Sequence, residues 1–566
     1  MLVYGDCQEP AEPNKVASEI NRRLDAVEAT PRGPGRHALL VAAFIETAKL
    51  LQGLADASFA KDGCDRLSTS SDRLGLFLHA LGKAVCNSWD NAEGRKLPRL
   101  RRARSWPGKV ELRVPEGFAF YAVYPEAYID AARRLALRAP AKVIGIRSIG
   151  TALGAIVAAA LGAGPAVTLR PFGGPFERQV ATDGALEREL LDREFHYVIV
   201  DEGPGQSGSS FGAVADWLTE HQVPPQRIAL LPSHAGEPGP EASSKRRCWW
   251  RTVHREVGDF GRSWPIRIER WCAPPLGRLD EPPLDVSAGE WRRLIYEREE
   301  EWPPVIPAFE RRKFLLRARG GRFLAKFAGL GRTGEDKLAI ARTLHGEGFV
   351  PEPQSLANGF LIERWREDGA PLESDDVPLE EIARYIAGRA KLLPAAKESG
   401  AGAEQLLLMT RRNISIEFDQ LRTRALQPWE RRAASLQARM SRVRTDNKLD
   451  RHEWLRSNAG SLIKTDALDH HQAHDLIGCQ DIAWDVAGAI VEFDVDQDGS
   501  DELLDRMDCA AAKPIDRELL DFYLLAYPAF RLGQARLGAA MTGEPAEKLR
   551  INRAADSYAS RLQRLL

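Results

Sequence analysis

The stretch Tyr197–Ser210, which reads YVIVDEGPGQSGSS, decides the fold class of the N-terminal part of the chain. Four apolar residues predict a buried strand, Asp201 and Glu202 end it, and a loop rich in Gly and Ser follows. Ligands bind at the carboxyl ends of strands in open α/β sheets. Bare amides and hydroxyls before a helix attract an anion. The stretch therefore predicts a phosphate-binding loop beside two acids that suit a polyol such as ribose.

Strand-like and helix-like segments alternate around this stretch, from about residue 110 to 235. Short apolar strands separated by helices are typical of a parallel sheet covered on both faces. The sequence thus predicts an α/β parallel-sheet domain. The expected strands span 142–146, 166–170, 197–200 and 227–231, and the expected helices span 151–162 and 211–221.

An apolar strand, two acids and a Gly- and Ser-containing loop resemble the type I phosphoribosyltransferase family over roughly 110–235. IGIRSIGT (144–151) stands after an earlier strand, where that family places its pyrophosphate loop. The resemblance implies that phosphoribosyl pyrophosphate (PRPP) binds with Mg²⁺ and that pyrophosphate is displaced at C1 of the ribose. In this resemblance Asp201 and Glu202 hold the ribose hydroxyls, Arg147 and Ser148 face the pyrophosphate, and Ser207, Gly208, Ser209 and Ser210 bind the 5′-phosphate.

A second pattern begins at about residue 310. KFLLR (313–317) and RFLAKF (322–327) predict a hairpin, and Lys326 lies on its second strand among apolar neighbours. A half-buried lysine needs an anionic partner, although a surface hairpin lysine is the simpler alternative. A helix over about 334–345 and short strands around Gln354 and at 360–363 should follow, and the remainder to 566 should be mostly helical, with an interruption at 445–480.

This order of elements resembles the aminoglycoside phosphotransferase and choline kinase-like family over about 305–566, which implies an α+β protein-kinase-like domain that uses ATP and Mg²⁺. DIAWDVAG (481–488) resembles that family's Asp-x-Ala-aromatic-Asp segment, although its two acids could equally be helix caps. The resemblance implies that Lys326 meets the nucleotide phosphates. It also implies that Glu335 orients Lys326, that Glu363 and Trp365 form the adenine hinge, that Asp466 binds Mg²⁺, that Asp446 or its rival Asp450 is the catalytic base, and that His452 replaces a metal-binding Asn.

Composition excludes several classes of protein. The 566 residues carry 79 basic and 80 acidic side chains, so no global field attracts nucleic acid or an anionic membrane. The run Arg95–Lys109 is basic and is either a solvated loop or an RNA or phosphate contact. Seven scattered cysteines without a CxxC pair fit a reducing cytosol. The charge-free stretch 148–167 is rich in Ala and Gly and is expected to be a buried helix rather than a membrane span. We therefore expect a cytoplasmic protein.

Two further patterns are weaker. His470, His471 and His474 could bind zinc or could line the phosphate pocket beside Asp466. The acidic stretch 494–505 mimics the start of a calcium loop but lacks its closing Glu, so a solvated turn is expected.

The sequence as a whole predicts four segments: a helical N-terminal segment (1–108), a phosphoribosyltransferase-like domain (109–235), a Pro- and Trp-rich connection (236–305) and a kinase-like domain (306–566). The leading hypothesis is a bifunctional enzyme that uses PRPP and ATP on a small metabolite or nucleoside. The alternatives are a PRPP- or nucleotide-sensing regulatory protein with degenerate catalytic loops, a dinucleotide or other phosphate site in the first domain, and an RNA-directed enzyme. The acceptor and the oligomeric state stay open.

Overall fold

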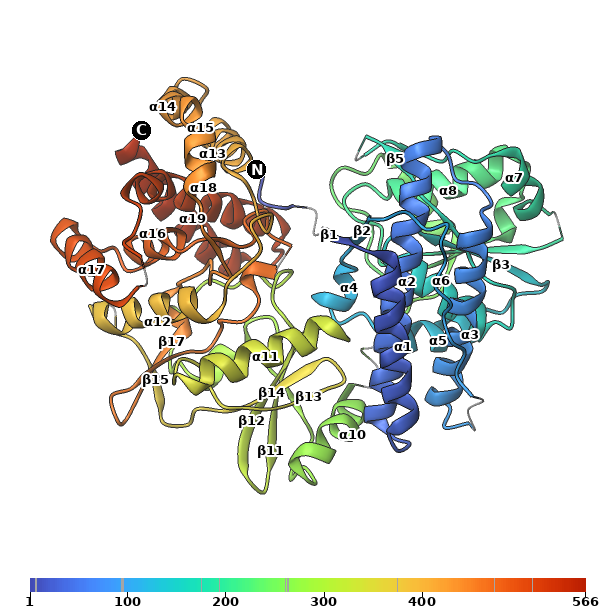
Figure 1. The fold of residues 1–566 in the computed structure, drawn as a ribbon, viewed down its shortest axis with the longest axis horizontal. Helices are drawn as coiled ribbons and strands as arrows, with labels where there is room; N and C mark the ends of the chain where they lie inside the picture. Colours follow the sequence, from blue (N-terminus) through green and yellow to red (C-terminus); the bar gives the residue numbers. More distant parts are fainter. Residues whose placement is uncertain are drawn as a thin grey trace.

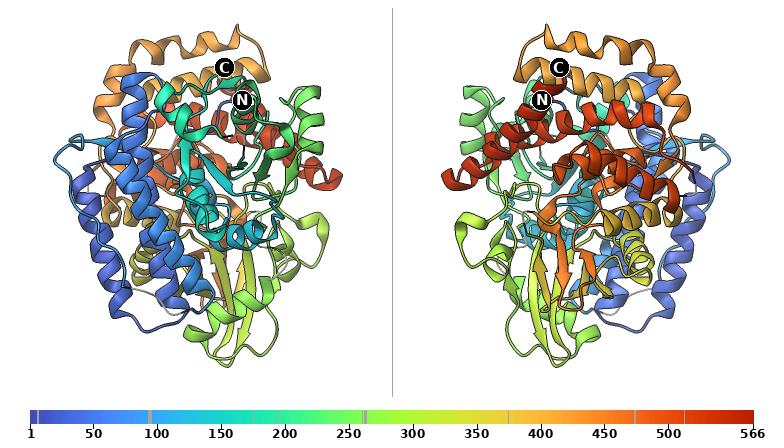
Figure 2. Two further views of the ribbon diagram at one scale, coloured as in Figure 1. Left: turned by 90° about the vertical axis from the view of Figure 1, so that its right-hand side faces the viewer. Right: turned by 90° about the vertical axis from the view of Figure 1, so that its left-hand side faces the viewer.

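The computed structural model describes the chain except for residues 6–7, 93–95, 175, 193, 260, 262–263, 374, 473 and 512. Figure 1 shows two bodies side by side, here called the N-terminal half (residues 8–276) and the C-terminal half (residues 284–566). An antiparallel sheet of the C-terminal half lies at the bottom of the molecule in both views of Figure 2.

Three long helices open the N-terminal half, as their apolar spacing predicts: α1 (Pro13–Ala29), α2 (Pro34–Asp62) and α3 (Thr69–Trp89). A short strand, β1 (Gln8–Ala11), pairs antiparallel with β2 (Val110–Arg113). Helix α2 is the one described helix long and apolar enough to cross a membrane by length and composition, and 83% of its most apolar window is buried inside the protein. The short helices α4 (Glu116–Ala119) and α5 (Pro125–Arg134) follow.

A five-stranded sheet forms the centre of the N-terminal half, with the strand order β4-β3-β7-β8-β9 and every neighbouring pair parallel. The α/β prediction is therefore confirmed as a parallel sheet. Gly145 in β3 is required, because a Cβ there would collide with the carbonyl oxygen of Gly150 in the covering helix α6. The elements are β3 (Ala141–Ile146), α6 (Ile149–Ala160), β4 (Val167–Leu169), β5 (Phe172–Gly173), β6 (Arg178–Gln179), α7 (Gly184–Leu190), β7 (His196–Val200), α8 (Ser209–Glu220), β8 (Ile228–Leu231), α9 (Ser244–Thr252) and β9 (His254–Arg255).

The Pro- and Trp-rich segment (236–305) contributes a strand to the sheet of each half. It supplies β9 to the parallel sheet, the helix α10 (Trp264–Leu276), and β10 (Leu284–Asp285) to the antiparallel sheet. Two 3₁₀-helices, η3 (Glu290–Leu294) and η4 (Glu299–Glu301), end it. Arg292 forms a buried ion pair with Glu547 at 2.8 Å, and Glu547 also accepts the backbone N–H of Val305. The segment is therefore fixed against the C-terminal helices.

The C-terminal half has the predicted α+β architecture. Its sheet has the order β10-β11-β12-β14-β13 and is antiparallel throughout. Its further strands are β11 (Lys313–Ala318), β12 (Gly321–Phe327), β13 (Pro353–Ala357) and β14 (Phe360–Arg364), with the helix α11 (Arg332–Gly346) between β12 and β13. The next strand, β15 (Gly369–Pro371), belongs to a separate three-stranded sheet with β17 and β18. The remaining elements are α12 (Leu379–Leu392), α13 (Ala403–Glu417), η5 (Arg422–Leu426), α14 (Gln427–Arg431), α15 (Ala433–Arg439), β16 (Arg442–Val443), η6 (Arg451–Glu453), β17 (Trp454–Ser457), β18 (Leu462–Lys464), η7 (His470–Gln472), β19 (Gln480–Asp481), α16 (Ala483–Glu492), α17 (Gln497–Ala510), α18 (Arg517–Met541) and α19 (Pro545–Leu565).

The two halves share one hydrophobic core. Apolar residues of α2, α5 and α6 pack in the same cluster as Phe314, Phe327 and Phe360 of the antiparallel sheet. Val3 precedes the N-terminal half in sequence but packs in the C-terminal half. Its side chain is buried in that core, and its carbonyl accepts the N–H of Leu476. Each half therefore completes the packing of the other.

Candidate functional site

A cavity of about 470 Å³ lies between the antiparallel sheet and the helical part of the C-terminal half. Strands β11, β12 and β14 form one wall, and the loops around 448–453 and 465–475 form the opposite wall. Trp291 and Val305 of the Pro- and Trp-rich segment (236–305) also line the cavity. Tyr121 lines it from the N-terminal half. Residues from all three parts of the chain thus surround one space.

Lys326 lies on β12 and faces this cavity, as the sequence predicts. Its Nζ lies 2.5 Å from Oδ1 of Asp466 and 3.9 Å from Oδ1 of Asp469. Burial alone would lower the pKa of Lys326, but the two carboxylates outweigh it and raise the pKa above its usual value. Lys326 therefore stays charged and joins the two walls of the cavity.

Glu335 does not orient Lys326, contrary to the prediction. Helix α11 turns Glu335 toward the N-terminal half, where both its carboxylate oxygens accept from Arg23 of α1 at 2.8 Å. The helix presents Lys337 to the interior instead, and Lys337 contacts Asp469 at 3.4 Å. Burial lowers the pKa of Lys337 to about 8. Asp469 also forms an ion pair with Arg311 at 3.0 Å. This one carboxylate therefore contacts Lys326, Lys337 and Arg311.

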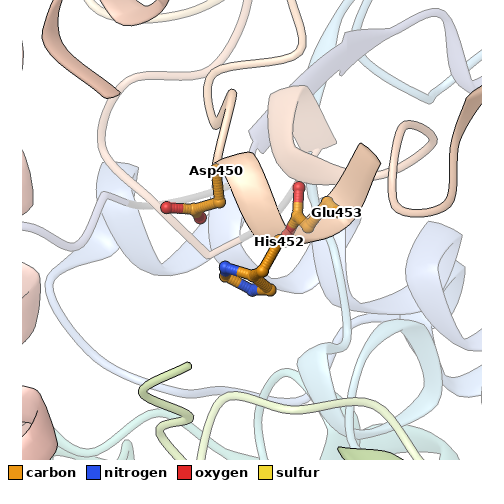
Figure 3. A group of neighbouring side chains, drawn as sticks. All are labelled: Asp450, His452 and Glu453. Atoms are coloured by element: carbon orange, nitrogen blue, oxygen red, sulfur yellow. The ribbon is translucent and has the colours of Figure 1, made fainter. Parts of the chain in front are cut away.

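Asp450, His452 and Glu453 project from the single turn around η6, as Figure 3 shows. Ligand atoms of these three residues lie within 4.8 Å of one another, and those of Glu453, Asp466 and His470 form a second such group. Burial lowers the pKa of His452 to about 4, so its ring is neutral near pH 7. These two groups, which share Glu453, are the places in the described chain where a metal ion could bind.

Sequence reasoning missed Glu453. The residue follows His452 directly, and the pattern Asp-Arg-His-Glu (450–453) could have indicated it, because a helical turn brings residues three apart to one side. A buried lysine, Lys464 at the end of β18, contacts the Glu453 carboxylate. Burial nevertheless raises the pKa of Glu453 to about 7.

Of the two acids expected as catalytic base, only Asp450 lines the cavity. Asp446 is 1% exposed and is enclosed by Tyr385, His470 and Lys464. It is therefore a buried structural acid, and its selection as the first candidate base is corrected. Burial alone would raise the pKa of Asp446, but Lys464 outweighs it and lowers the pKa to about 2.

Asp450 is held by the C-terminal helices. Arg531 of α18 donates to its Oδ1 at 2.7 Å and also pairs with Glu492 at 3.0 Å. Burial would raise the pKa of Asp450, but the Arg531 guanidinium outweighs it and holds the pKa well below its usual range. Asp450 is therefore an ionised hydrogen-bond acceptor at the cavity wall.

The acids of the DIAWDVAG segment support the loop from behind. Asp485 accepts the backbone N–H groups of Asp446 and Asn447 at 2.8 and 2.9 Å. Asp481 accepts those of Ser441 and Ala483 at 2.8 and 3.0 Å. Both acids thus bind backbone amides, and Asp485 fixes the start of the loop that carries Asp450.

Glu363 and Trp365, the expected hinge, both line the cavity at the end of β14. Glu363 lies opposite Leu324 in the β12–β14 register. Burial raises the pKa of Glu363 to about 7. The hinge residues therefore lie on the same wall as Lys326.

Asp201 and Glu202 lie at the carboxyl end of β7, where the sequence places them. Burial raises the pKa of Asp201 to about 7 and, with Glu116 adding repulsion, that of Glu202 to about 8. Glu202 accepts the backbone N–H of Gly117 at 3.0 Å. Glu116 in turn pairs with His474 of the C-terminal cavity at 2.8 Å. The two acids therefore lie at the junction with the C-terminal half.

The expected phosphate loop precedes α8. Gly208 takes a left-handed conformation (φ 68°) directly before the helix, and the Ser207 hydroxyl accepts the N–H of Ser209. Ser209 and Ser210 are the first residues of α8. The three serines and Gly208 are thus placed together at a helix N-terminus, as predicted.

Arg147 does not face a pyrophosphate site, and this prediction is corrected. Its guanidinium is buried and donates to Asp65, to Asp56 at 3.2 Å and to the Thr168 carbonyl at 3.0 Å. Those acids come from α2 and from the segment after it, which sequence reasoning did not connect with the sheet. The neighbouring Ser148 begins the turn into α6 with a φ of 136°.

Three weaker sequence patterns remain: the basic run Arg95–Lys109, the acidic stretch 494–505 and His471. In the basic run, Arg95 lies outside the described residues, whereas Arg99 pairs with Asp25 and Glu28 of α1. The acidic stretch forms a helix start, since Asp496 caps α17 through the Gly499 amide. His471 is buried away from the cavity, and burial lowers its pKa well below the usual value.

Comparisons with known proteins match only part of the chain. No protein-family model and no curated protein sequence matches it. Among solved structures, choline kinase LicA from Streptococcus pneumoniae is 16% identical, with a TM-score of 0.34, covering 44% of this chain and 89% of its own. Macrolide 2′-phosphotransferase type I is 15% identical, with a TM-score of 0.34, covering 52% and 95%. Spectinomycin phosphotransferase, solved with ADP and spectinomycin, is 11% identical, with a TM-score of 0.29, covering 45% and 90%.

Proposed function

We propose that the C-terminal half transfers the terminal phosphoryl group of ATP to a hydroxyl of a small molecule. The observation that carries this proposal is the arrangement of Lys326 and Asp466 across one cavity, with Asp450 and Glu453 beside them. Phosphoryl transfer needs little more than charge neutralisation and positioning. A charged lysine and several carboxylates facing one space fit that need.

Each cavity residue has a proposed role in this reaction. Lys326 neutralises the nucleotide phosphates, and Asp466 is one of the residues that would hold a metal ion. Asp450 accepts a hydrogen bond from the acceptor hydroxyl and orients it. Its low pKa makes it a weak base, which suffices because the transition state of phosphoryl transfer is loose. Glu363 and Trp365 line the end of the cavity that would receive the base of the nucleotide.

The donor set fits Mg²⁺. Glu453 and Asp466 offer carboxylate oxygens within 4.8 Å of one another, and oxygen is the ligand that Mg²⁺ prefers. Mg²⁺ bound there would supply charge stabilisation of the transferred phosphoryl group. Lys464, which contacts Glu453, fixes that carboxylate toward the cavity.

Isothermal titration of ADP and of a non-hydrolysable ATP analogue, both with Mg²⁺, tests the proposal. Lys326→Met and Asp466→Asn should weaken binding by about 10- to 100-fold, because each removes a charged contact. Asp494→Asn, at a side chain that is 89% exposed, should bind like the unmodified protein. If the unmodified protein binds neither nucleotide, the proposed phosphotransferase activity of the C-terminal half is refuted.

We further propose that the N-terminal half binds a ribose phosphate such as PRPP. Two raised-pKa acids at a strand end beside a glycine-led helix N-terminus support this second function. Titration of PRPP with Mg²⁺ should show binding that Asp201→Asn and Glu202→Gln weaken and that the exposed control Glu220→Gln retains. Equal PRPP affinity in all four proteins would contradict this role.

A further inference from the structure

The basic side chains of the C-terminal cavity are almost all paired with carboxylates. Lys326 pairs with Asp466, as described above. Six other basic side chains of the cavity each form an ion pair with a different carboxylate: Arg311 with Asp469 at 3.0 Å, Lys313 with Glu310 at 2.8 Å, Arg322 with Glu367 at 2.9 Å, Arg364 with Glu352 at 3.6 Å, Arg366 with Asp368 at 2.8 Å and Arg531 with Asp450 at 2.7 Å. Lys448 also lines the cavity, and no carboxylate of the described residues lies within 4.0 Å of its Nζ. Lys448 is therefore the lysine or arginine lining this cavity that has no ion-pair partner within 4.0 Å among the described residues.

The backbone around Lys448 is fixed. The preceding residue, Asn447, has a left-handed φ of 69°, its N–H donates to Asp485, and its side chain donates to the Gly478 carbonyl at 2.8 Å. The following residue, Leu449, is fully buried. Asn tolerates the left-handed region better than most residues, so this turn suits the sequence. Lys448 is thus presented to the cavity by a rigid loop rather than by a mobile surface.

Lys448 stands beside the residue proposed to orient the acceptor. Its charge contributes to the low pKa of Asp450, two residues further on, and opposes protonation of His470. Lys326, on the opposite sheet wall, already serves the nucleotide in the proposed function. An anionic group held by Lys448 would therefore belong to the molecule whose hydroxyl meets Asp450.

One carboxylate oxygen in this cavity has no hydrogen-bond partner among the described residues. This atom is the buried Oδ2 of Asp475, and Asp475 lines the same space. A carboxylate oxygen of this kind accepts from hydroxyl groups. An unneutralised cation and an unsatisfied acceptor in one cavity suit a molecule that carries both an anion and hydroxyls.

We propose that the acceptor of the C-terminal half is a polyhydroxylated anion of the sugar-phosphate class, anchored by Lys448. This inference rests on the proposed phosphotransferase and names its substrate class.

Titration of D-ribose 5-phosphate, with uncharged D-ribose as the matched probe and no nucleotide present, tests the anchor. The protein should bind the phosphate ester more tightly than ribose. Lys448→Met should lose one ribose 5-phosphate binding event or weaken it by about tenfold or more, while Lys448→Arg retains it. A site in the N-terminal half would persist in every variant. The exposed Lys391→Met is the charge-matched control and should match the unmodified protein.

Ribose 5-phosphate affinity that is equal in Lys448→Met and unmodified protein would overturn the anchor, as would absence of any binding up to millimolar concentration. A second arm titrates Mg²⁺-ADP and a non-hydrolysable Mg²⁺-ATP analogue into Lys448→Met, which should bind both normally. Selective loss of the triphosphate would place Lys448 at the nucleotide and also overturn the proposal. Unmodified protein that binds ribose 5-phosphate but no nucleotide would instead refute the phosphotransferase and keep the anion site.

Discussion

Glu335 on α11 and Arg23 on α1 form a bidentate ion pair, with both oxygen–nitrogen distances at 2.8 Å. The pair joins the helical start of the chain to the helix that lies against the antiparallel sheet. The family resemblance would use Glu335 to orient Lys326. In the structure Lys326 contacts Asp466 and Asp469 instead. Different acids therefore hold the junction between the halves and the proposed nucleotide site.

Glu335→Gln should leave the affinity for Mg²⁺-ADP within about twofold, because Glu335 does not contact Lys326. Its effect should appear in stability, at about 0.5–1 kcal/mol, since the pair is partly exposed. Isothermal titration and denaturant unfolding measure the two quantities. Arg23→Met should give the same stability loss, and the double variant should lose no more than either single one. A tenfold fall in nucleotide affinity would contradict this assignment.

Glu453→Gln should weaken binding of Mn²⁺, used as a paramagnetic substitute for Mg²⁺, by at least about tenfold, because both candidate groups share this carboxylate. Electron paramagnetic resonance of free Mn²⁺ measures the affinity. His452→Gln and His470→Gln separate the two groups, since only the group that holds the ion should lose affinity. Unchanged binding in Glu453→Gln would exclude both groups.

The unfolding free energy of the protein should fall as pH rises toward 9, and Glu202 should account for part of that fall. Burial raises its pKa from 4.5 to about 8 in the folded state, so between these values the folded chain holds a proton that the unfolded chain has released. Stability is therefore lost as pH rises through the folded pKa. Denaturant unfolding at pH 6, 7, 8 and 9 should show a shallower fall for Glu202→Gln. Parallel curves for the two proteins would contradict this.

Arg292→Met should destabilise the protein by about 1.5–3 kcal/mol, because it removes the more buried of the two cations that contact the Glu547 carboxylate and leaves only Arg550, at 3.0 Å. The neighbouring Arg293 provides a matched control. Its ion pair with Glu290 is solvent-exposed, so Arg293→Met should cost about 0–1 kcal/mol. Denaturant unfolding followed by tryptophan fluorescence measures both. Equal losses would show that the connection is not fixed through Arg292.

The sequence predicted those elements whose signals are local. Three strands of the parallel sheet, β3, β7 and β8, follow apolar runs of four to six residues such as YVIV, which are enough to mark a buried strand. Strand β9 has two residues and lies in the segment that the sequence predicted to be a connection. The hairpin carrying Lys326 follows from its Gly-containing turn. The same locality explains why Asp201 and Glu202 follow β7 and why Ser207, Ser209 and Ser210 lie at the start of α8, whereas their roles stay predictions.

Pairings between distant residues were not predictable. Arg147 looked like a ligand for an anion because its neighbours in sequence are polar or small, but its partners Asp56 and Asp65 come from 91 and 82 residues earlier. Asp446 and Asp450 are equally acidic in sequence, and only burial by Tyr385 and Lys464 separates them. Lys448 gave no signal at all, since a lysine in a loop is ordinary until its neighbours are seen to be paired.

The packing of Leu2 and Val3 in the C-terminal half has a consequence for how the protein folds during synthesis. Leu2 donates its N–H to Asn413, which follows it by 411 residues, and Val3 fills a position in the core of the C-terminal half. These first residues are synthesised before any of the structure that receives them. Leu2 and Val3 must wait until Asn413 has left the ribosome, so the core of the C-terminal half includes a segment made 411 residues earlier than one of its partners. A protein expressed from residue 306 onward would lack that piece, and a bulky tag fused at the first residue would compete with its docking.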